Sequence, residues 1–290
     1  MPSLKTLQPG DEGVLETFLS QYPDTSMFLR SNLQAAGLVN QGARFQGTYV
    51  AAIEDEVVTA VAAHYWNGMI VIQAPIHLES VVQEVVSQSG KTISGITGPT
   101  QQVEAAREVL GLANRPIRLS ESEILFSLAL QDLRVPTMLT SGQVQCRLPH
   151  LEELELLTEW CIAYSVEALE QVNTPSLHQN CYRTIEARQA TATHWVLVAE
   201  ETLVSYSAFN ACLPEIVQIG GVWTPPNLRG KGYAKCVVAG SLISAQSQKV
   251  NRAVLFTSEH NIAAQAVYRG LGFQLLLEKY GLLIFKDESE

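Results

Sequence analysis

The chain carries a weak internal repeat, and this feature limits its fold more than any other. The segment AAREVLGL at 105–112 resembles AVYRGLGF at 266–273, and each follows a short apolar run. Nearer the start of each half, AAIEDEVVTAVAA from Ala51 resembles VLVAEETLVSYSA from Val196. Both of these segments are typical of two strands joined by an acidic turn. Chance similarity between short apolar runs is the alternative, but collinear matches with a steadily growing offset favour a duplication.

A length of 290 residues suits two domains of ordinary size. The hydrophobic fraction of 47% excludes a disordered chain and supplies material for a sizeable core. Pro, Thr, Ser and Gly cluster in RVPTMLTSGQ at 134–143, which predicts the connection between the halves. The sequence therefore predicts two domains, 1–138 and 139–290, each built from strands and amphipathic helices.

The net charge of −10 argues against nonspecific binding to nucleic acid or to an anionic membrane. Net charge also favours a cationic ligand over an acidic one, although it says little about a single pocket. No apolar run is long enough for a membrane span, and the N-terminus lacks the pattern of a secretory signal. Five widely spaced cysteines without a CxxC motif fit unpaired thiols in a reducing compartment. We therefore expect a cytoplasmic protein without a metal site.

The two halves differ after their central strand. In the first half VIQAP at 71–75 passes almost directly into a helical pattern, whereas in the second IGGVWTPP at 219–226 is followed by NLRGKGYAKC. The growing offset predicts an insertion of about ten residues at this point. Whatever this loop does, only the second half can do it.

The inserted loop has the composition of an anion site. Arg229 and Lys231 alternate with Gly230 and Gly232 just before a helical pattern, so backbone N–H groups would converge at the helix N-terminus. A P-loop is excluded because Lys231 is followed by glycine instead of Ser or Thr. A dinucleotide fingerprint is excluded because Lys235 stands where its third glycine belongs. The pattern that remains is R-x-x-G-x-[GA].

With its downstream context, this loop resembles the pyrophosphate loop of the GNAT family of acyl-CoA-dependent N-acetyltransferases. The strand AVLFT is followed by Asn261, then Tyr268 and the tripeptide Leu271-Gly272-Phe273, in the order that the family shows. The resemblance covers about 144–285. It implies a mixed, mostly antiparallel α/β sheet flanked by helices, present twice. The first copy is degenerate, because it lacks the loop and has Thr100 and Arg107 where Asn261 and Tyr268 would align.

The family resemblance implies acetyl-CoA as co-substrate, with no metal. Val222 and Thr224 would pair with the amide-bearing pantetheine arm in the manner of an added strand. Asn261 would hydrogen-bond the cofactor, or would cap the following helix. The pyrophosphate would be held by the loop residues Arg229, Gly230, Lys231, Gly232, Tyr233 and Ala234.

Two residues are the candidate catalytic groups that the resemblance implies. Tyr268 would stabilise the departing thiolate, and a hydrogen bond that strengthens as sulfur gains charge suits its pKa better than early proton donation. Its alternative is a core aromatic on the last helix. Glu215 would be the general base for the attacking amine, or else an exposed carboxylate in a turn after Pro214.

The predicted function is transfer of an acetyl group from acetyl-CoA to a primary amine by direct attack, with the site in the C-terminal half. The acceptor would be a small molecule or a peptide, with no nucleic acid or membrane partner, and a homodimer is left open. Because no base is unambiguous, a non-catalytic acyl-CoA-binding or sensing module is the alternative.

Overall fold

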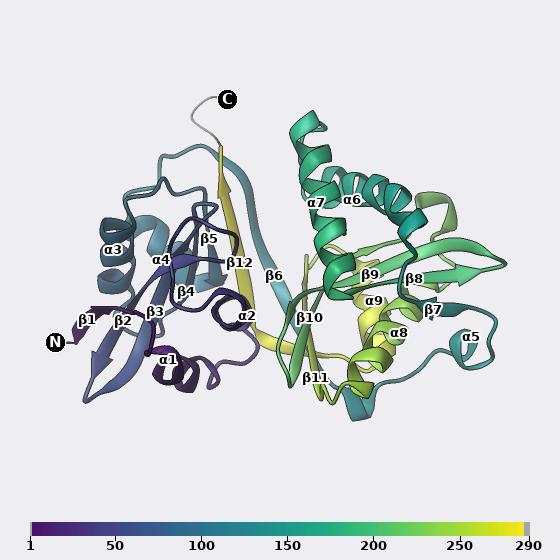
Figure 1. Ribbon diagram of the computed structural model, residues 1–290, viewed down its shortest axis with the longest axis horizontal. Helices are drawn as coiled ribbons and strands as arrows, with labels where there is room; N and C mark the ends of the chain where they lie inside the picture. The colour runs from purple at the N-terminus through teal and green to yellow at the C-terminus, as the bar shows by residue number, and fades with distance from the viewer. Residues whose placement is uncertain (1, 287–290) are drawn as a thin grey trace. The chain divides into compact units, whose positions relative to one another are not determined.

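The computed structural model describes residues 2–286, which form two compact units (Figure 1). The N-terminal unit comprises the chain up to Leu125 together with the segment from Leu276 onward. The C-terminal unit comprises Phe126–Leu275. The boundary at 138/139 predicted from the repeat stays a prediction about the duplicated halves, whereas the compact units assign the last strand to the N-terminal unit.

The N-terminal unit contains one strand, two helices, three strands and then an alternation of helix and strand. Its elements are β1 (Ser3–Thr6), α1 (Glu12–Leu19), α2 (Met27–Ala36), β2 (Gly47–Glu54), β3 (Val57–Tyr65), β4 (Met69–Gln73), α3 (Leu78–Ser89), β5 (Gly95–Pro99), α4 (Thr100–Val109) and most of β6 (Ile117–Ala129).

The C-terminal unit repeats this order. Its elements are η1 (Leu130–Asp132), α5 (Thr137–Thr140), β7 (Gln145–Arg147), η2 (Leu151–Glu153), α6 (Leu154–Ala168), α7 (Pro175–Thr191), β8 (His194–Ala199), β9 (Thr202–Cys212), β10 (Ile216–Trp223), η3 (Pro226–Leu228), α8 (Tyr233–Ser247), β11 (Arg252–Thr257) and α9 (Ile262–Leu271), of which η1, α5, η2 and η3 are one-turn helices. Apart from the one-turn helices, each unit reads β-α-α-β-β-β-α-β-α. The predicted tandem α/β repeat is therefore confirmed at the level of element order.

The final strand β12 (Gln274–Phe285) pairs with the N-terminal unit, although it follows α9 in the chain. Tyr280–Ile284 lies antiparallel to Gly95–Pro99 of β5, and Figure 1 shows this yellow strand beside the strands of the first half. In the other direction, the end of β6 lies next to β11, where Arg252 Nε donates to Ser127 Oγ at 2.9 Å. The second half of the chain thus adds β12 to the sheet of the N-terminal unit, and the first half adds the end of β6 to the sheet of the C-terminal unit.

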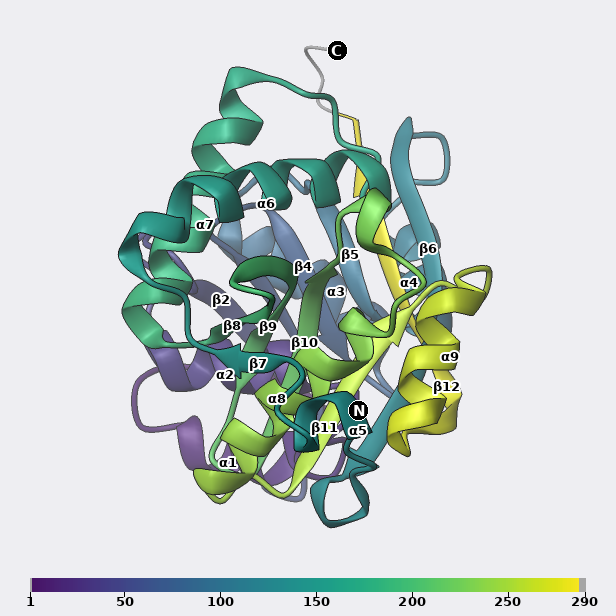
Figure 2. The same ribbon diagram turned by 90° about the vertical axis from the view of Figure 1, so that its right-hand side faces the viewer.

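Both units place their sheet between helices. In the N-terminal unit one core joins α1 and α2 to the strands, and a second core joins α3 and α4 to the opposite face. In the C-terminal unit α6 and α7, which lie next to each other in both views (Figures 1 and 2), pack on β8, β9 and β10. Helix α8 packs on the same sheet through fully buried residues such as Val237 and Leu242. Sheets covered on both faces account for the long apolar runs of the sequence.

Local sequence sets the ends of the helices around the candidate site. Thr174 accepts a hydrogen bond from Leu177 N and precedes Pro175, which begins α7. Asn261 caps α9 by accepting from Ala264 N at 3.1 Å, and Gly272 ends that helix at φ +104°. The N-cap role that the sequence offered for Asn261 is therefore present.

The loop that distinguishes the halves is shorter than predicted. Residues 74–77 join β4 to α3, whereas residues 224–232 join β10 to α8. The difference is five residues instead of about ten, because α8 is longer than α3 and because residues 258–261 separate β11 from α9 while β5 runs directly into α4. The growth of the offset between the two repeats therefore reflects all three differences, not the loop alone.

Candidate active site

In the C-terminal unit, β10 pairs with its parallel neighbour β11 only over its first half. The parallel ladder joins Ile216–Ile219 of β10 to Arg252–Leu255 of β11 and then ends. Beyond it, β10 keeps its antiparallel partner β9 but has no described partner on β11. The strands therefore part at the carboxyl end of β10, which is the edge from which the loop to α8 departs.

A β-bulge lies at the point where the strands part. The pairing of β10 with β9 shifts between Gly220 and Trp223, so Gly221 and Val222 have no Cα partner in either described register. Gly221 has φ +64°, which only glycine adopts without strain, and a Cβ at Gly220 would overlap the Asn210 amide. Gly221 is therefore favoured by the backbone conformation, and Gly220 by the space that the Asn210 side chain occupies.

The loop after β10 presents a row of backbone amides. Gly230 and Gly232 have φ +77° and +81°, and α8 begins at Tyr233 without a side-chain cap. Among the described residues, no acceptor bonds the N–H groups from Gly230 to Ala234. Unpaired amides at a helix N-terminus favour an anion, because each N–H needs an acceptor and the helix dipole adds positive potential.

The side chain of Arg229 is held by the protein. Its Nε donates to Thr224 O at 3.0 Å, Nη1 lies 2.8 Å from Glu167 Oε1 and Nη2 lies 3.0 Å from Glu167 Oε2. Its guanidinium carbon also lies 4.9 Å from the ring centroid of Trp223. Arg229, although exposed, therefore joins the loop to α6 and β10, and Lys231 is a second exposed cation of the loop. The ion pair with Arg229 brings Glu167 of α6 to the loop.

Val222 and Thr224, predicted to meet the pantetheine arm, lie on either side of Trp223 at the open end of β10. Val222 is half-buried in the bulge. Thr224 is buried, and its Oγ1 is 2.8 Å from Ser205 Oγ on β9. Since Thr224 O accepts from Arg229, only part of the Thr224 backbone faces outward.

Tyr268 and Glu215 occupy different surroundings. Tyr268 is buried on α9, with ring centroids 6.2 Å from Phe126 and 5.9 Å from Phe273. Glu215 directly precedes β10, and its carbonyl accepts from Arg252 N, at the closed end of the ladder. Five residues of extended chain, about 16 Å, separate Glu215 from Gly220. The structure thus brings the loop, Val222 and Thr224 together and leaves Glu215 at the opposite end of the strand.

Comparison with known proteins matches the model of the acetyltransferase (GNAT) family to residues 155–273. This segment contains the parted strands, the amide loop and α9. It is a GNAT domain. No curated protein sequence matches the chain significantly.

Solved structures share the fold over nearly the whole chain. A Drosophila protein has a TM-score of 0.69 at 10% identity, with 98% of this chain and 99% of that chain covered. A tandem GNAT protein from the clavulanic acid biosynthesis pathway has a TM-score of 0.58 at 11% identity, with 98% of both chains covered. A GCN5-related N-acetyltransferase from Sphaerobacter thermophilus has a TM-score of 0.58 at 13% identity, covering 97% of this chain and 94% of that chain. At these identities the likeness concerns the fold, and it extends the GNAT-like architecture to the first half of the chain.

The N-terminal GNAT-like copy differs from the second copy at the end of its central strand β4. Its β4–β5 pairing is parallel over Met69–Val71, but the side chain of Gln102 on α4 accepts from Ala74 N at 2.7 Å, directly after β4. Residues 74–77 leave no room for a loop of free amides. In this copy a side chain thus satisfies the backbone directly after β4, and the longer loop that follows β10 has no counterpart.

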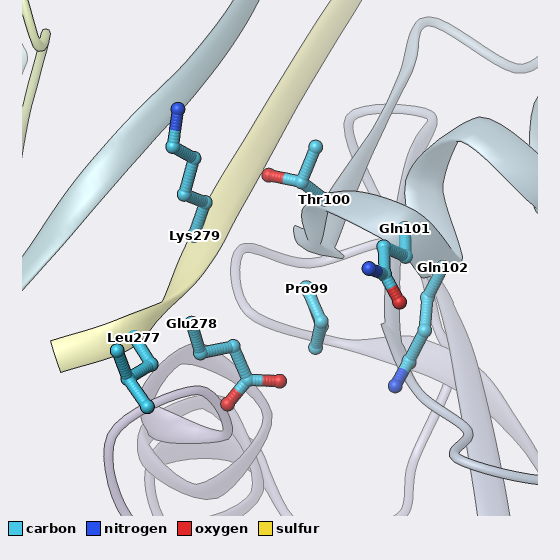
Figure 3. A pocket seen from close by; sticks show the side chains of 7 residues that line it. All are labelled: Pro99, Thr100, Gln101, Gln102, Leu277, Glu278 and Lys279. Atoms are coloured by element: carbon cyan, nitrogen blue, oxygen red, sulfur yellow. The ribbon is translucent and has the colours of Figure 1, made fainter.

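A pocket of about 380 Å³ lies elsewhere in the N-terminal unit (Figure 3). It is lined by Pro99, Thr100, Gln101, Gln102, Leu277, Glu278 and Lys279. Burial, and to a smaller extent the charge of Asp24, raises the pKa of Glu278. Glu278 and Lys279 leave β12 on opposite sides, and the residues that line the pocket belong to neither the loop nor the parted strands.

The sequence analysis did not predict a polar network that joins α7 to β8 and β9, next to the bulge of β10. Arg188 on α7 donates to Tyr206 OH and to Asn210 Oδ1, both on β9, and His194 contacts the same tyrosine hydroxyl. Burial, and then the charge of Arg188, lowers the pKa of His194 to about 4. No motif marks these residues, because they are brought together by the pairing of α7 with the sheet.

Within residues 2–286, every helix is too short or too polar to cross a bilayer. No three side chains of His, Cys, Asp or Glu in that range are grouped to hold a metal ion.

Proposed function

We propose that the protein is an acyl-CoA-dependent N-acetyltransferase whose reaction takes place in the C-terminal unit. One observation carries this proposal: the strands β10 and β11 part beside a loop whose amides, from Gly230 to Ala234, have no described protein acceptor. A diphosphate and an extended amide-bearing arm, joined in one molecule, complement these two features.

The residues present fit acetyl-CoA. The amides from Gly230 to Ala234 would hold the pyrophosphate, and the positive φ of Gly230 and Gly232 turns them outward. Lys231 adds an exposed positive charge. Val222 and Thr224 would bond the pantetheine amides along the open strand, and Asn261, besides capping α9, would lie at the adjoining helix end.

Bound acetyl-CoA supplies the thioester that a deprotonated amine attacks, so that a C–N bond forms, the C–S bond breaks and the thiolate leaves. A backbone N–H at the Gly220–Val222 bulge would stabilise the negative charge that develops on the carbonyl oxygen. Tyr268 would donate a hydrogen bond to the departing sulfur as charge builds there. The proton lost by the amine balances the proton gained by the thiol.

Two carboxylates are candidates for the base that takes the proton of the amine. Glu215 is the residue that sequence reasoning favoured, but it lies at the closed end of β10. Glu167 is nearer the opening through its ion pair with Arg229. Glu215→Gln and Glu167→Gln, compared across a pH series, therefore test whether either carboxylate serves directly or whether water carries the proton.

The distance of Glu215 from the bulge also favours a second candidate, a module that binds acyl-CoA without transferring it. Calorimetric titration of the full chain with acetyl-CoA, followed by thiol release with a panel of amines, separates the two. Binding with release supports the enzyme, and binding without release on any amine supports the module. Absence of acetyl-CoA binding overturns both.

The first copy, 1–138, is proposed to bind no acetyl-CoA, because Gln102 occupies the equivalent backbone position. The proposed location is the cytoplasm, supported by five cysteines that are all free thiols. The acceptor amine is proposed to be a small molecule or a peptide.

A further inference from the structure

Arg188 lies directly against the bulge where the central strands part. If Gly221 carried a Cβ, that atom would be 3.3 Å from Arg188 Nη1 and 3.6 Å from Nη2. Gly221 lies two positions after Ile219, the last residue of β10 that pairs with β11. The side chain of the half-buried Arg188 therefore reaches the opening from α7 and lies against Gly221, which has no side chain to exclude it.

The position of Arg188 is fixed by a chain of hydrogen bonds that has one consistent direction. Arg188 Nη1 donates to Tyr206 OH at 3.1 Å, and the pKa of His194, lowered by burial, keeps that ring neutral. Neutral His194 donates from Nε2 to Gln189 Oε1 at 2.8 Å, so its Nδ1 is the acceptor for the Tyr206 hydroxyl at 3.2 Å. Arg188 Nη2 also donates to Asn210 Oδ1 at 2.7 Å. The arginine is thus held before any ligand arrives.

The charge of Arg188 has no counterion in the described part of the chain. Its two hydrogen-bond partners are a hydroxyl and an amide, and the nearby loop carboxylate of Glu167 is already paired with Arg229. A guanidinium has five N–H donors, so three remain for a ligand, in a fork that matches a carboxylate. A preorganised, half-buried cation that lacks a described counterion favours an anionic group beside it.

We propose that Arg188 binds a carboxylate of the acceptor, so that the substrate is an amine that also carries a carboxylate, such as a free amino acid. This inference rests on the proposed function, because it places the acceptor at the opening of β10. It runs against the net charge of −10, which by itself favours a cationic acceptor. A local cation outweighs distant surface charge because bulk charges are screened over about 8–10 Å.

The wild-type chain provides the first test. Thiol release from acetyl-CoA is measured with amino acids and with their carboxamides, which keep the amine and remove the anion. Hydrogen bonds to a charged group predict kcat/KM about 10- to 100-fold higher for the carboxylate. The amine of a carboxamide is less basic and so more often deprotonated, which works against the expected result and makes the comparison strict.

Variants assign the preference to Arg188. Arg188→Gln is expected to lower kcat/KM for the amino acid about 10- to 100-fold while leaving the rate with the carboxamide and the affinity for acetyl-CoA nearly unchanged. Arg188→Lys should restore part of the preference. Arg183→Gln removes the same charge from an exposed position of the same helix and should change neither rate. Thermal unfolding of each variant reports whether the network still folds.

Each outcome decides the matter. Equal rates for acids and amides, or faster release with a diamine or with O-phosphoethanolamine than with any carboxylate-bearing amine, overturns the assignment and leaves the proposed function standing. A preference that survives Arg188→Gln also overturns it. Acetyl-CoA binding without release for any acceptor overturns this inference together with the proposed enzyme. Should Arg188→Gln fail to fold, the wild-type comparison and Arg188→Lys still give the answer.

Discussion

Glu167 on α6 pairs with Arg229 of the loop before α8, with Oε1 2.8 Å from Nη1 and Oε2 3.0 Å from Nη2. The same guanidinium bonds Thr224 O and lies against Trp223. Arg229, the arginine of the R-x-x-G-x-[GA] pattern, therefore acts as a clamp on the loop. Under the proposed function, the backbone amides from Gly230 to Ala234 would meet the diphosphate.

Removing one side of this clamp should have a small effect. Glu167→Gln is expected to weaken acetyl-CoA binding by no more than about fivefold, because an exposed ion pair contributes at most about 1 kcal/mol. Arg229→Ala should weaken it more, since the hydrogen bond to Thr224 and the contact with Trp223 are lost as well. Calorimetry measures both, with Glu159→Gln on the same helix as the matched control. Tighter binding by Glu167→Gln would mean that the freed guanidinium, instead of the amides, serves the anion.

Gly232 is the residue on which the loop conformation depends. A Cβ there would meet only Met138 Sδ at 4.0 Å, but φ is +81°, so Gly232→Ala strains the backbone without a clash. We expect the amides to turn away and the Kd for acetyl-CoA to rise about tenfold or more. Gly42→Ala, in the N-terminal unit at φ +82° with no atom within 4 Å, carries the same kind of strain and should leave the Kd unchanged. An equal change in both would reduce the result to lost stability.

Tyr268→Phe separates the catalytic role of this residue from its packing role. The ring contacts with Phe126 and Phe273 are kept by phenylalanine, so the fold should be retained. Loss of a hydrogen bond to the developing thiolate should lower kcat about 10- to 100-fold with little change in acetyl-CoA affinity. An unchanged kcat would leave Tyr268 as a core aromatic only.

The repeat and the loop could be predicted from the sequence because they depend on local signals. Apolar periodicity marked the strands and helices, and the spacing of Arg229, Gly232, Ala234 and Asn261 carried the family resemblance. Each of these patterns lies within a short stretch of the sequence, and the structure places the loop and Asn261 at the carboxyl ends of β10 and β11.

Other features depend on contacts that no local pattern encodes. The pairing of β12 with β5 could not be read from the chain, because β12 looks like the natural last strand of the second half. The capping of Ala74 by Gln102 and the approach of Arg188 to Gly221 join segments that are far apart in sequence. Glu215 was favoured for its place on the strand, but strand polarity decides which end opens.

The buried His194 should make the stability of the C-terminal unit depend on pH. Burial and the charge of Arg188 lower its pKa to about 4 in the folded state, whereas the unfolded chain binds the proton near the ordinary value of about 6.5. Between these values the unfolded state holds more protons, so the free energy of unfolding should fall as the pH falls from about 6.5 to about 4, by up to about 1.4 kcal/mol per pH unit. Denaturant titrations at pH 7 and pH 5 measure this slope. His64 of the N-terminal unit shifts in the same direction, so His194→Gln, which removes only the His194 share, is the informative variant. An identical slope in wild type and variant would show that His194 is not held neutral, and the direction assigned to the Tyr206–His194 hydrogen bond would then be wrong.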